Sequence, residues 1–239
     1  MSNAIGFLNY IRLGWLDATL AHHISSKNIE TVKKNLYNLI EKEIQSKEVT
    51  RKTIDVLTRT WVRIPSEDKG LQEDAMKFYD EISPSKRHLL HWGMLLIRFP
   101  FFRDICYYVG LLDSIQKEIP VKKLQQKMVD KWGHRTSMIR ALDRVIQSMI
   151  EWNVITKSNS FLYVNEPIEI KETDLSLWFL ECLFKAENVQ TMAYENLISS
   201  LAKFPFVINL PSYYVKKSER FEYYIQGTNL ETVSLKNAM

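Results

Sequence analysis

Apolar residues recur three or four positions apart along most of the chain, which is the period of an α-helix that buries one face. Before residue 83 this spacing predicts four helices, whose first apolar or capping residues are Phe7, Asn28, Thr50 and Leu71. The helix that follows Pro84 is apolar almost all round and should lie at the centre of the fold. We therefore expect residues 1–99 to form a helical bundle with short connections.

Three further helices are predicted from residue 100 onward. The first should run over residues 101–117, and Pro120 should set the start of the second, because proline is tolerated in the first turn of a helix. Gly133 should end the second helix, since glycine supplies the backbone freedom that a sharp turn between helices requires.

The third helix of this region, over residues 136–153, has two contrasting sides. Thr136 or Ser137 should cap its start. Its buried side carries apolar residues at helical spacing: Ile139, Leu142, Ile146, Met149 and Ile150. Its other side carries polar residues at i, i+3, i+7 and i+10: Ser137, Arg140, Arg144 and Gln147. The pattern predicts a helix with one face in the core and a cationic face in solvent.

Basic residues gather in the same part of the chain. The whole chain has a formal net charge of +4. Residues 117–144 contain eight Lys or Arg and three acidic residues, a difference of +5, so the remainder is about neutral. A local excess of cations suits a phosphate backbone, because each contact with a phosphate releases counterions.

Two β-rich runs, at 154–155 and 161–164, follow the third helix and predict a hairpin around a polar turn. Three helices, a glycine turn and a hairpin in this order resemble the winged helix-turn-helix superfamily, over about 65 of the 239 residues, 100–164. In that family the third helix commonly enters the major groove of DNA, and the hairpin, or wing, touches phosphates or the minor groove. The resemblance implies that these residues contact DNA: Lys122, Lys123, Lys127, His134, Arg135, Ser137, Arg140, Arg144, Gln147 and Lys157.

The residues after the hairpin predict a third region. An acidic connector at 167–173 should lead to two helices, at 175–186 and 189–203. Strands are then expected at 206–210, 221–225 and 232–235, with a turn at 226–229. This region could be a second, degenerate winged helix or a cap on the first. Its tyrosines could stack on bases or form a partner interface: Tyr213, Tyr214, Tyr223 and Tyr224.

Signals of other chemistry are weak. The sequence holds no phosphate loop, nucleophile elbow or zinc spacing, so we expect no enzyme, no cofactor and no metal. His88 and His91 stand three apart without a third ligand, which favours a packing role. Cys106 and Cys182 lie within apolar helical patterns and should be buried free thiols. Without a secretory signal or an apolar run that could span a bilayer, we expect a cytoplasmic protein with no membrane partner.

The sequence thus predicts a mainly α protein with a helical bundle (1–99), a central winged helix-turn-helix (100–166) and C-terminal helices with a small antiparallel β-hairpin or sheet (167–239). We expect a non-catalytic protein that binds double-stranded DNA, as a regulator or as the DNA-engaging subunit of a larger complex. Other subunits or a second copy would be its protein partners. A role in bacterial genome defence against phage is a further hypothesis, which no particular residue supports. The alternative is an interaction scaffold whose winged helix mediates dimerisation or docking, because the wing holds a single lysine and basic helices are often plain solvated surface.

Overall fold

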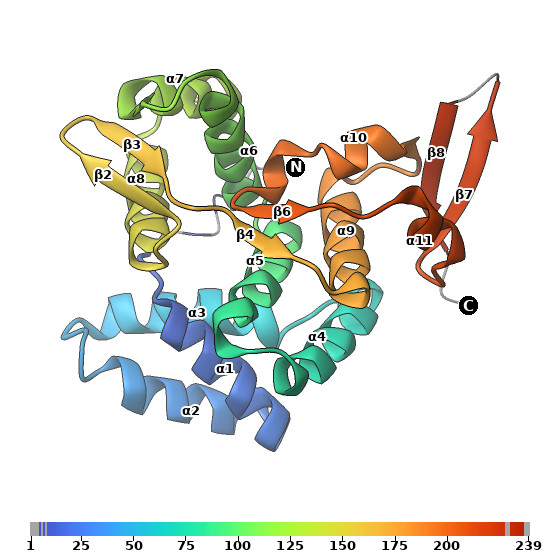
Figure 1. The fold of residues 1–239 in the computed structure, drawn as a ribbon. Coiled ribbons are helices and arrows are strands. Elements are labelled where there is room, and N and C mark those ends of the chain that lie inside the picture. Colours follow the sequence, from blue (N-terminus) through green and yellow to red (C-terminus); the bar gives the residue numbers. More distant parts are fainter. Residues whose placement is uncertain (1–4, 6, 8, 228–229, 237–239) are drawn as a thin grey trace.

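The structure is a computed structural model that describes residues 5, 7, 9–227 and 230–236. It is mainly helical, as the sequence predicts, and it holds three small sheets among these residues, one of which, the parallel pair β4 (Ile168–Ile170) and β6 (Phe206–Ile208), was not predicted. Figure 1 shows helix α5 (Arg87–Arg98) near the centre, the N-terminal helices below it, and a group of helices and strands on either side above. Thr228 and Asn229, which belong to the expected turn at 226–229, lie outside the described residues.

The N-terminal helices follow the apolar spacing, although some of their starts differ from the prediction. Their bounds are α1 (Leu13–Ser26), α2 (Ile29–Ile40), α3 (Lys47–Trp61), η1 (Ser66–Asp68), α4 (Lys69–Glu81) and η2 (Pro84–Lys86). Asn28 caps α2 as expected, since its side-chain oxygen accepts two backbone N–H groups at 3.0 Å. Thr50 was wrongly predicted as a cap: Ser46 caps α3, and Thr50 is buried in the helix, where its hydroxyl donates to Ser46 O at 3.1 Å. Phe7 is buried in the segment that precedes α1.

Helix α5 is the central helix that its apolar circumference predicts. It packs against α1, α3, α4, α6 (Pro100–Ile115) and α9 (Thr173–Glu187). A Cβ atom added at Gly93 would come within 2.7 Å of the Trp178 ring, so the glycine permits the close approach of α5 and α9.

The central module, defined here as residues 100–164, contains three helices and a three-stranded antiparallel sheet. After α6 come β1 (Ile119–Pro120), α7 (Val121–Trp132), α8 (Thr136–Glu151), β2 (Ile155–Ser158) and β3 (Phe161–Val164). The strand order is β1-β3-β2. Strand β1 was not predicted, because two residues, one of them Pro120, have no β pattern of their own; they are extended through pairing with Phe161 and Leu162.

The C-terminal module, defined here as residues 173–235, differs from the prediction between its first helix and its last hairpin. It contains α9, β5 (Met192–Ala193), α10 (Tyr194–Ile198), η3 (Leu201–Lys203), β6 (Phe206–Ile208), α11 (Ser212–Lys217), β7 (Phe221–Gln226) and β8 (Leu230–Leu235). The helix expected over 189–203 is wrong, since Met192 and Ala193 pair with β8 and leave room for a helix of only five residues. The connector also contains a strand, β4 (Ile168–Ile170), which runs parallel to β6.

The two modules share an order of elements, apart from two insertions. In each, a long helix is followed by a two-residue strand, two helices and a hairpin, but in the C-terminal module η3 and β6 lie between α10 and α11. The sheet order is also the same, β1-β3-β2 in the first and β5-β8-β7 in the second. The second and third helices are much shorter in the C-terminal module, with α10 at five and α11 at six residues.

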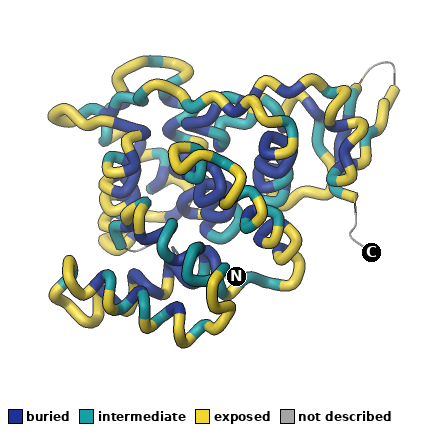
Figure 2. The backbone as a smooth tube through the Cα atoms, turned by 60° about the horizontal axis from the view of Figure 1, so that its bottom comes forward, coloured by how far each residue is buried: buried dark blue, intermediate teal, exposed yellow. Residues whose placement is uncertain are grey.

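One hydrophobic core runs through the bundle and both modules. Figure 2 shows buried positions at the centre of the molecule and exposed ones on loops and outer helix sides. Cys106 and Cys182 are free and buried in this core, as predicted, and burial raises the pKa of each thiol well above its ordinary value. The core explains why the modules hold fixed positions against the bundle.

Candidate nucleic-acid interface

Helix α8 presents its polar side to solvent. Its inner side is buried in the central module, at Met138, Ala141, Leu142, Val145, Ile146 and Met149. Ser137, Arg140, Arg144 and Gln147 are all exposed, on the side that the sequence predicts. The Arg144 guanidinium donates a hydrogen bond to Gln147 Oε1 at 2.8 Å, within this polar stripe. Among the described residues, neither arginine has an acidic partner in an ion pair, so both charges face water.

The turn between α7 and α8 is built as predicted at Gly133 and differently at the cap. Gly133 has a φ of +78°, in the region that favours glycine, and ends α7. The cap position of α8 is taken by Arg135, whose side chain instead donates to Trp132 O at 3.2 Å. The cap predicted at Thr136 or Ser137 is therefore wrong, because helical geometry already begins at Thr136. The exposed Thr136 hydroxyl and the first backbone amides of α8 also belong to the candidate surface, and the sequence analysis did not predict them.

A buried carboxylate fixes the end of α7 against α6. Asp104 is 2% exposed, and its Oδ2 accepts the indole N–H of Trp132 at 2.9 Å. Its Oδ1 lies 2.9 Å from Lys131 Nζ and 3.0 Å from Arg103 Nη2. Lys131 therefore neutralises an internal acid and is not free for DNA. The network sets where the turn at Gly133, and hence α8, begins.

Replacing Asp104 with asparagine should lower the free energy of unfolding by about 2 kcal/mol, because Arg103 and Lys131 lose the buried carboxylate that neutralises them. Chemical denaturation followed by tryptophan fluorescence would measure it. Asp130→Asn, on the exposed side of α7, is the matched control and should change stability little. Equal effects of the two substitutions would contradict the anchoring role of Asp104.

The lysines of α7 and of the hairpin β2–β3 lie on the surface as predicted. Lys122 and Lys123 are exposed in the first turn of α7, and Lys127 is half-buried one turn later. Lys157 is exposed on β2, the edge strand of the hairpin β2–β3. None of the four forms an ion pair with a described residue. His134, in the turn, is exposed as well.

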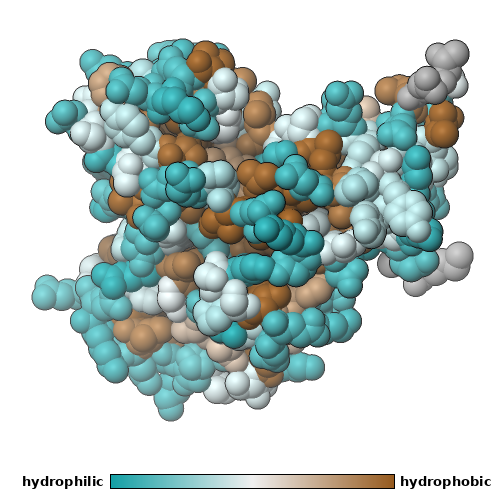
Figure 3. All heavy atoms as spheres, viewed as in Figure 1, coloured by the Kyte–Doolittle hydropathy of each residue, from teal (hydrophilic) through white to brown (hydrophobic). Residues whose placement is uncertain are grey.

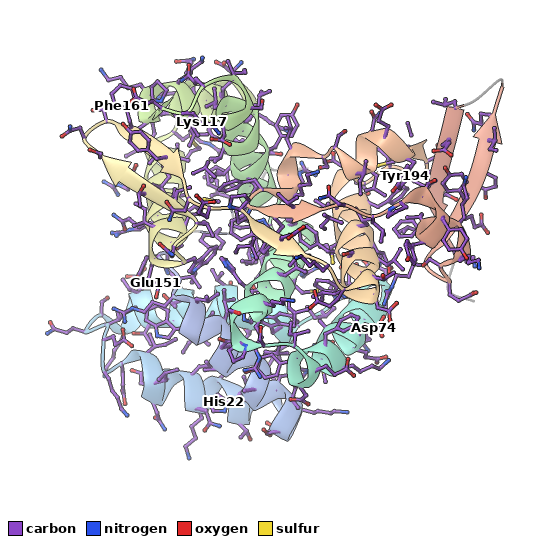
Figure 4. All side chains as sticks on the ribbon, viewed as in Figure 1. His22, Asp74, Lys117, Glu151, Phe161 and Tyr194 are labelled. Atoms are coloured by element: carbon purple, nitrogen blue, oxygen red, sulfur yellow. The ribbon has the colours of Figure 1, made fainter. Side chains whose placement is uncertain are left out.

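The last turn of α8 is covered by the chain that enters the N-terminal bundle. Ile11 N donates to Ser148 Oγ at 2.9 Å, and Leu13 N donates to Glu151 Oε2 at 3.0 Å. The Trp152 indole donates to Ile11 O at 3.0 Å. Figure 4 labels Glu151 at this end of α8, beside the N-terminal helices. The open part of α8 is therefore its first three turns.

The two histidines considered as ligands are core residues. His91 accepts the Trp61 indole N–H at Nδ1 (3.0 Å), and its Nε2 lies 3.0 Å from Asp17 Oδ1. An indole can only donate, so the proton of neutral His91 is on Nε2 and points at Asp17. His88 is packed between aromatic rings, and burial, with a smaller effect from His91, lowers its pKa to about 3. Among the described residues no three His, Cys, Asp or Glu side chains gather as a metal site.

Comparison with known proteins adds no assignment. No family model, curated protein or solved structure matches this chain. Within the described part of the chain, no helix has the length and apolar character needed to cross a membrane. The candidate surface is therefore judged on its geometry and charge.

Proposed function

We propose that the protein binds duplex DNA through the central module, as a winged helix-turn-helix protein does. The observation that carries the proposal is the open polar stripe of α8, with Arg140 and Arg144 exposed and without acidic partners among the described residues. Arginine in such a position can take the two acceptors that guanine presents in the major groove.

The order of elements supports the same proposal. Three helices, a wing and a short strand between the first two helices form an α-β-α-α-β-β arrangement with sheet order β1-β3-β2. An α-helix fits the width of the major groove, and α8 has a hairpin directly beside it in sequence. Lys122 and Lys123 start the helix before it, where they would contact phosphates.

The C-terminal module repeats this order without an equivalent charge. Lys216 pairs with Glu231, and Lys185 pairs with Asp68. Arg220 bridges Asp74 and Glu181, at 2.6 and 2.7 Å. Three of the five cations of this module, Lys185, Lys216 and Arg220, are thus paired with acids, so we assign DNA contact to the central module. We propose that the C-terminal module is a degenerate copy that serves a different purpose.

The second candidate function is a scaffold in which the modules bind only proteins. Exposed tyrosines and aliphatic side chains of the C-terminal module favour it, since aromatic residues are enriched at protein interfaces. A scaffold of this kind would show no salt-dependent affinity for DNA.

Binding of random-sequence duplex DNA at several salt concentrations tests the proposal. We expect the affinity to fall steeply with salt, because phosphate contacts release counterions. Lys122→Ala with Lys123→Ala should reduce the slope of log affinity against log salt by about 2, and should weaken binding equally on every sequence.

A matched control is Lys47→Ala with Arg51→Ala. These residues are exposed and line a groove between α2 and α3. The control removes the same net charge and should leave the slope unchanged. Binding that is absent or insensitive to salt would contradict DNA binding, and equal slopes in both double variants would contradict the role of α7.

A further inference from the structure

The hairpin β7–β8 extends away from the body of the molecule and exposes apolar side chains. Nine large apolar side chains are exposed among the described residues, and five of them fall in this module's last helix and hairpin: Tyr213, Tyr214, Tyr224, Ile225 and Leu230. Figure 1 shows the hairpin projecting at one side, and Figure 3 shows hydrophobic atoms beside its grey tip. Such a concentration marks an interaction surface.

Both faces of the hairpin carry exposed apolar side chains at its far end. Phe221 is buried and Tyr223 half-buried, and both face the module. Ile225 lies on the same face of the strand, but past the helices that cover that face, and is 66% exposed. Tyr224 and Leu230 lie on the opposite face and are 43% and 54% exposed. A hairpin that only met water would be polar on at least one face.

Strand β7 is also an unguarded edge. It has six residues and pairs only with β8, so its other side carries backbone N–H and C=O groups that no described strand pairs. The corresponding edge strand of the central module, β2, has four residues, of which Thr156, Lys157 and Ser158 are exposed and polar. Proteins usually blunt an edge with short length and lysine, as β2 does. Strand β7 lacks both protections.

We propose that β7 pairs with β7 of a second copy of the chain, antiparallel and centred on Tyr224. A two-fold axis perpendicular to the sheet keeps each side chain on its own face of the sheet, and residues directly opposite each other share a face. The residue at the centre must therefore face itself. Centring on Tyr224 opposes the two Tyr224 rings, places Tyr223 across from Ile225, and places Glu222 across from Gln226.

The charges fit this register. Glu222 is the one ionisable carboxylate of β7, and it meets an amide. Centring on Glu222 would instead oppose two carboxylates. The pairing would join two three-stranded sheets into one of six strands, and its two-fold symmetry closes the assembly. The inference does not depend on DNA binding, since no residue of α8 takes part.

Disulfide trapping of full-length Tyr224→Cys tests the register. Directly opposed residues have Cα atoms about 4.5–5.5 Å apart, within the range that a disulfide spans. Cys106 and Cys182 are buried and do not compete. We expect mild oxidation to convert most of this variant to a covalent dimer. The matched control, Thr156→Cys on the exposed edge of β2, should stay monomeric on the same gel.

A charge exchange at the axis gives an independent test by sedimentation. Tyr224→Lys and Tyr224→Glu each oppose like charges and should weaken dimerisation about ten-fold or more, while an equal mixture of the two should dimerise again. Thr156→Lys should leave the dimer intact, and melting curves check that each variant is folded. A wild-type protein that is monomeric at about 100 µM, or a folded Tyr224→Lys that dimerises like the wild type, would overturn the proposal, as would equal trapping of both cysteine variants.

Discussion

Replacing Arg140 and Arg144 together with alanine is expected to weaken binding to a preferred DNA sequence about 100-fold. Each arginine that takes two acceptors on a base contributes about 1–3 kcal/mol of discrimination, so two contacts are worth about 3 kcal/mol. Both side chains are exposed, and neither has an acidic partner among the described residues. The loss should therefore appear in binding rather than in folding.

The form of the loss matters as much as its size. The arginine pair should weaken binding to the preferred sequence more than to random duplex, because base contacts carry sequence information and phosphate contacts do not. Fluorescence anisotropy with both duplexes would measure the ratio. The lysine pair Lys122 and Lys123 is the comparison, since its replacement should lower both affinities equally. An equal loss on both duplexes in the arginine variant would refute base reading by α8.

Acidification from pH 7 to pH 4.5 is expected to cost the folded protein about 3 kcal/mol through His88 alone. Burial lowers the pKa of His88 from 6.5 to about 3, and its Nε2 has no hydrogen-bond partner among the described residues. Below pH 6.5 His88 binds a proton in the unfolded chain, but in the folded protein it stays neutral. Stability therefore falls by about 1.4 kcal/mol per pH unit until the pH approaches 3.

His88→Phe isolates this effect, because phenylalanine can keep the edge-to-face contacts with Trp92, Trp152 and Phe206. Its free energy of unfolding should fall less steeply with acid, and at pH 7 it should equal or exceed that of the wild type, since the buried, unpartnered Nε2 of His88 is removed. His22→Gln, at the outer edge of the bundle in Figure 4, is the control. Parallel stability curves for wild type and His88→Phe would rule out the role assigned to His88.

The parts of the fold that depend on local chemistry could be read from the sequence. Asn28 caps α2 through its own side chain, and Gly133 ends α7 through its own backbone freedom. The stripe of α8 follows from helical period alone, so the exposure of Arg140 and Arg144 was predictable. In each of these cases the residue that predicts the feature also forms it, without a distant partner.

The parts that depend on distant partners could not be read. Strand β1 is extended because β3 lies beside it, and β5 is a strand because β8 does. Lys131 looked like its neighbours on α7, but Asp104, 27 positions away, takes its charge. An acidic residue directly beside the apolar run Ile105–Cys106 of α6 was the available signal for that anchor.

The junction at residues 11–13 also limits how the molecule can transmit force. Three hydrogen bonds join residues 11–13 to the end of α8. One of them is donated by the indole of Trp152, which is buried. Helix α8 and the bundle therefore cannot move relative to each other without breaking these hydrogen bonds and exposing the Trp152 indole to water. If α8 binds a DNA duplex as we propose, the duplex would be held at a fixed angle to the N-terminal bundle.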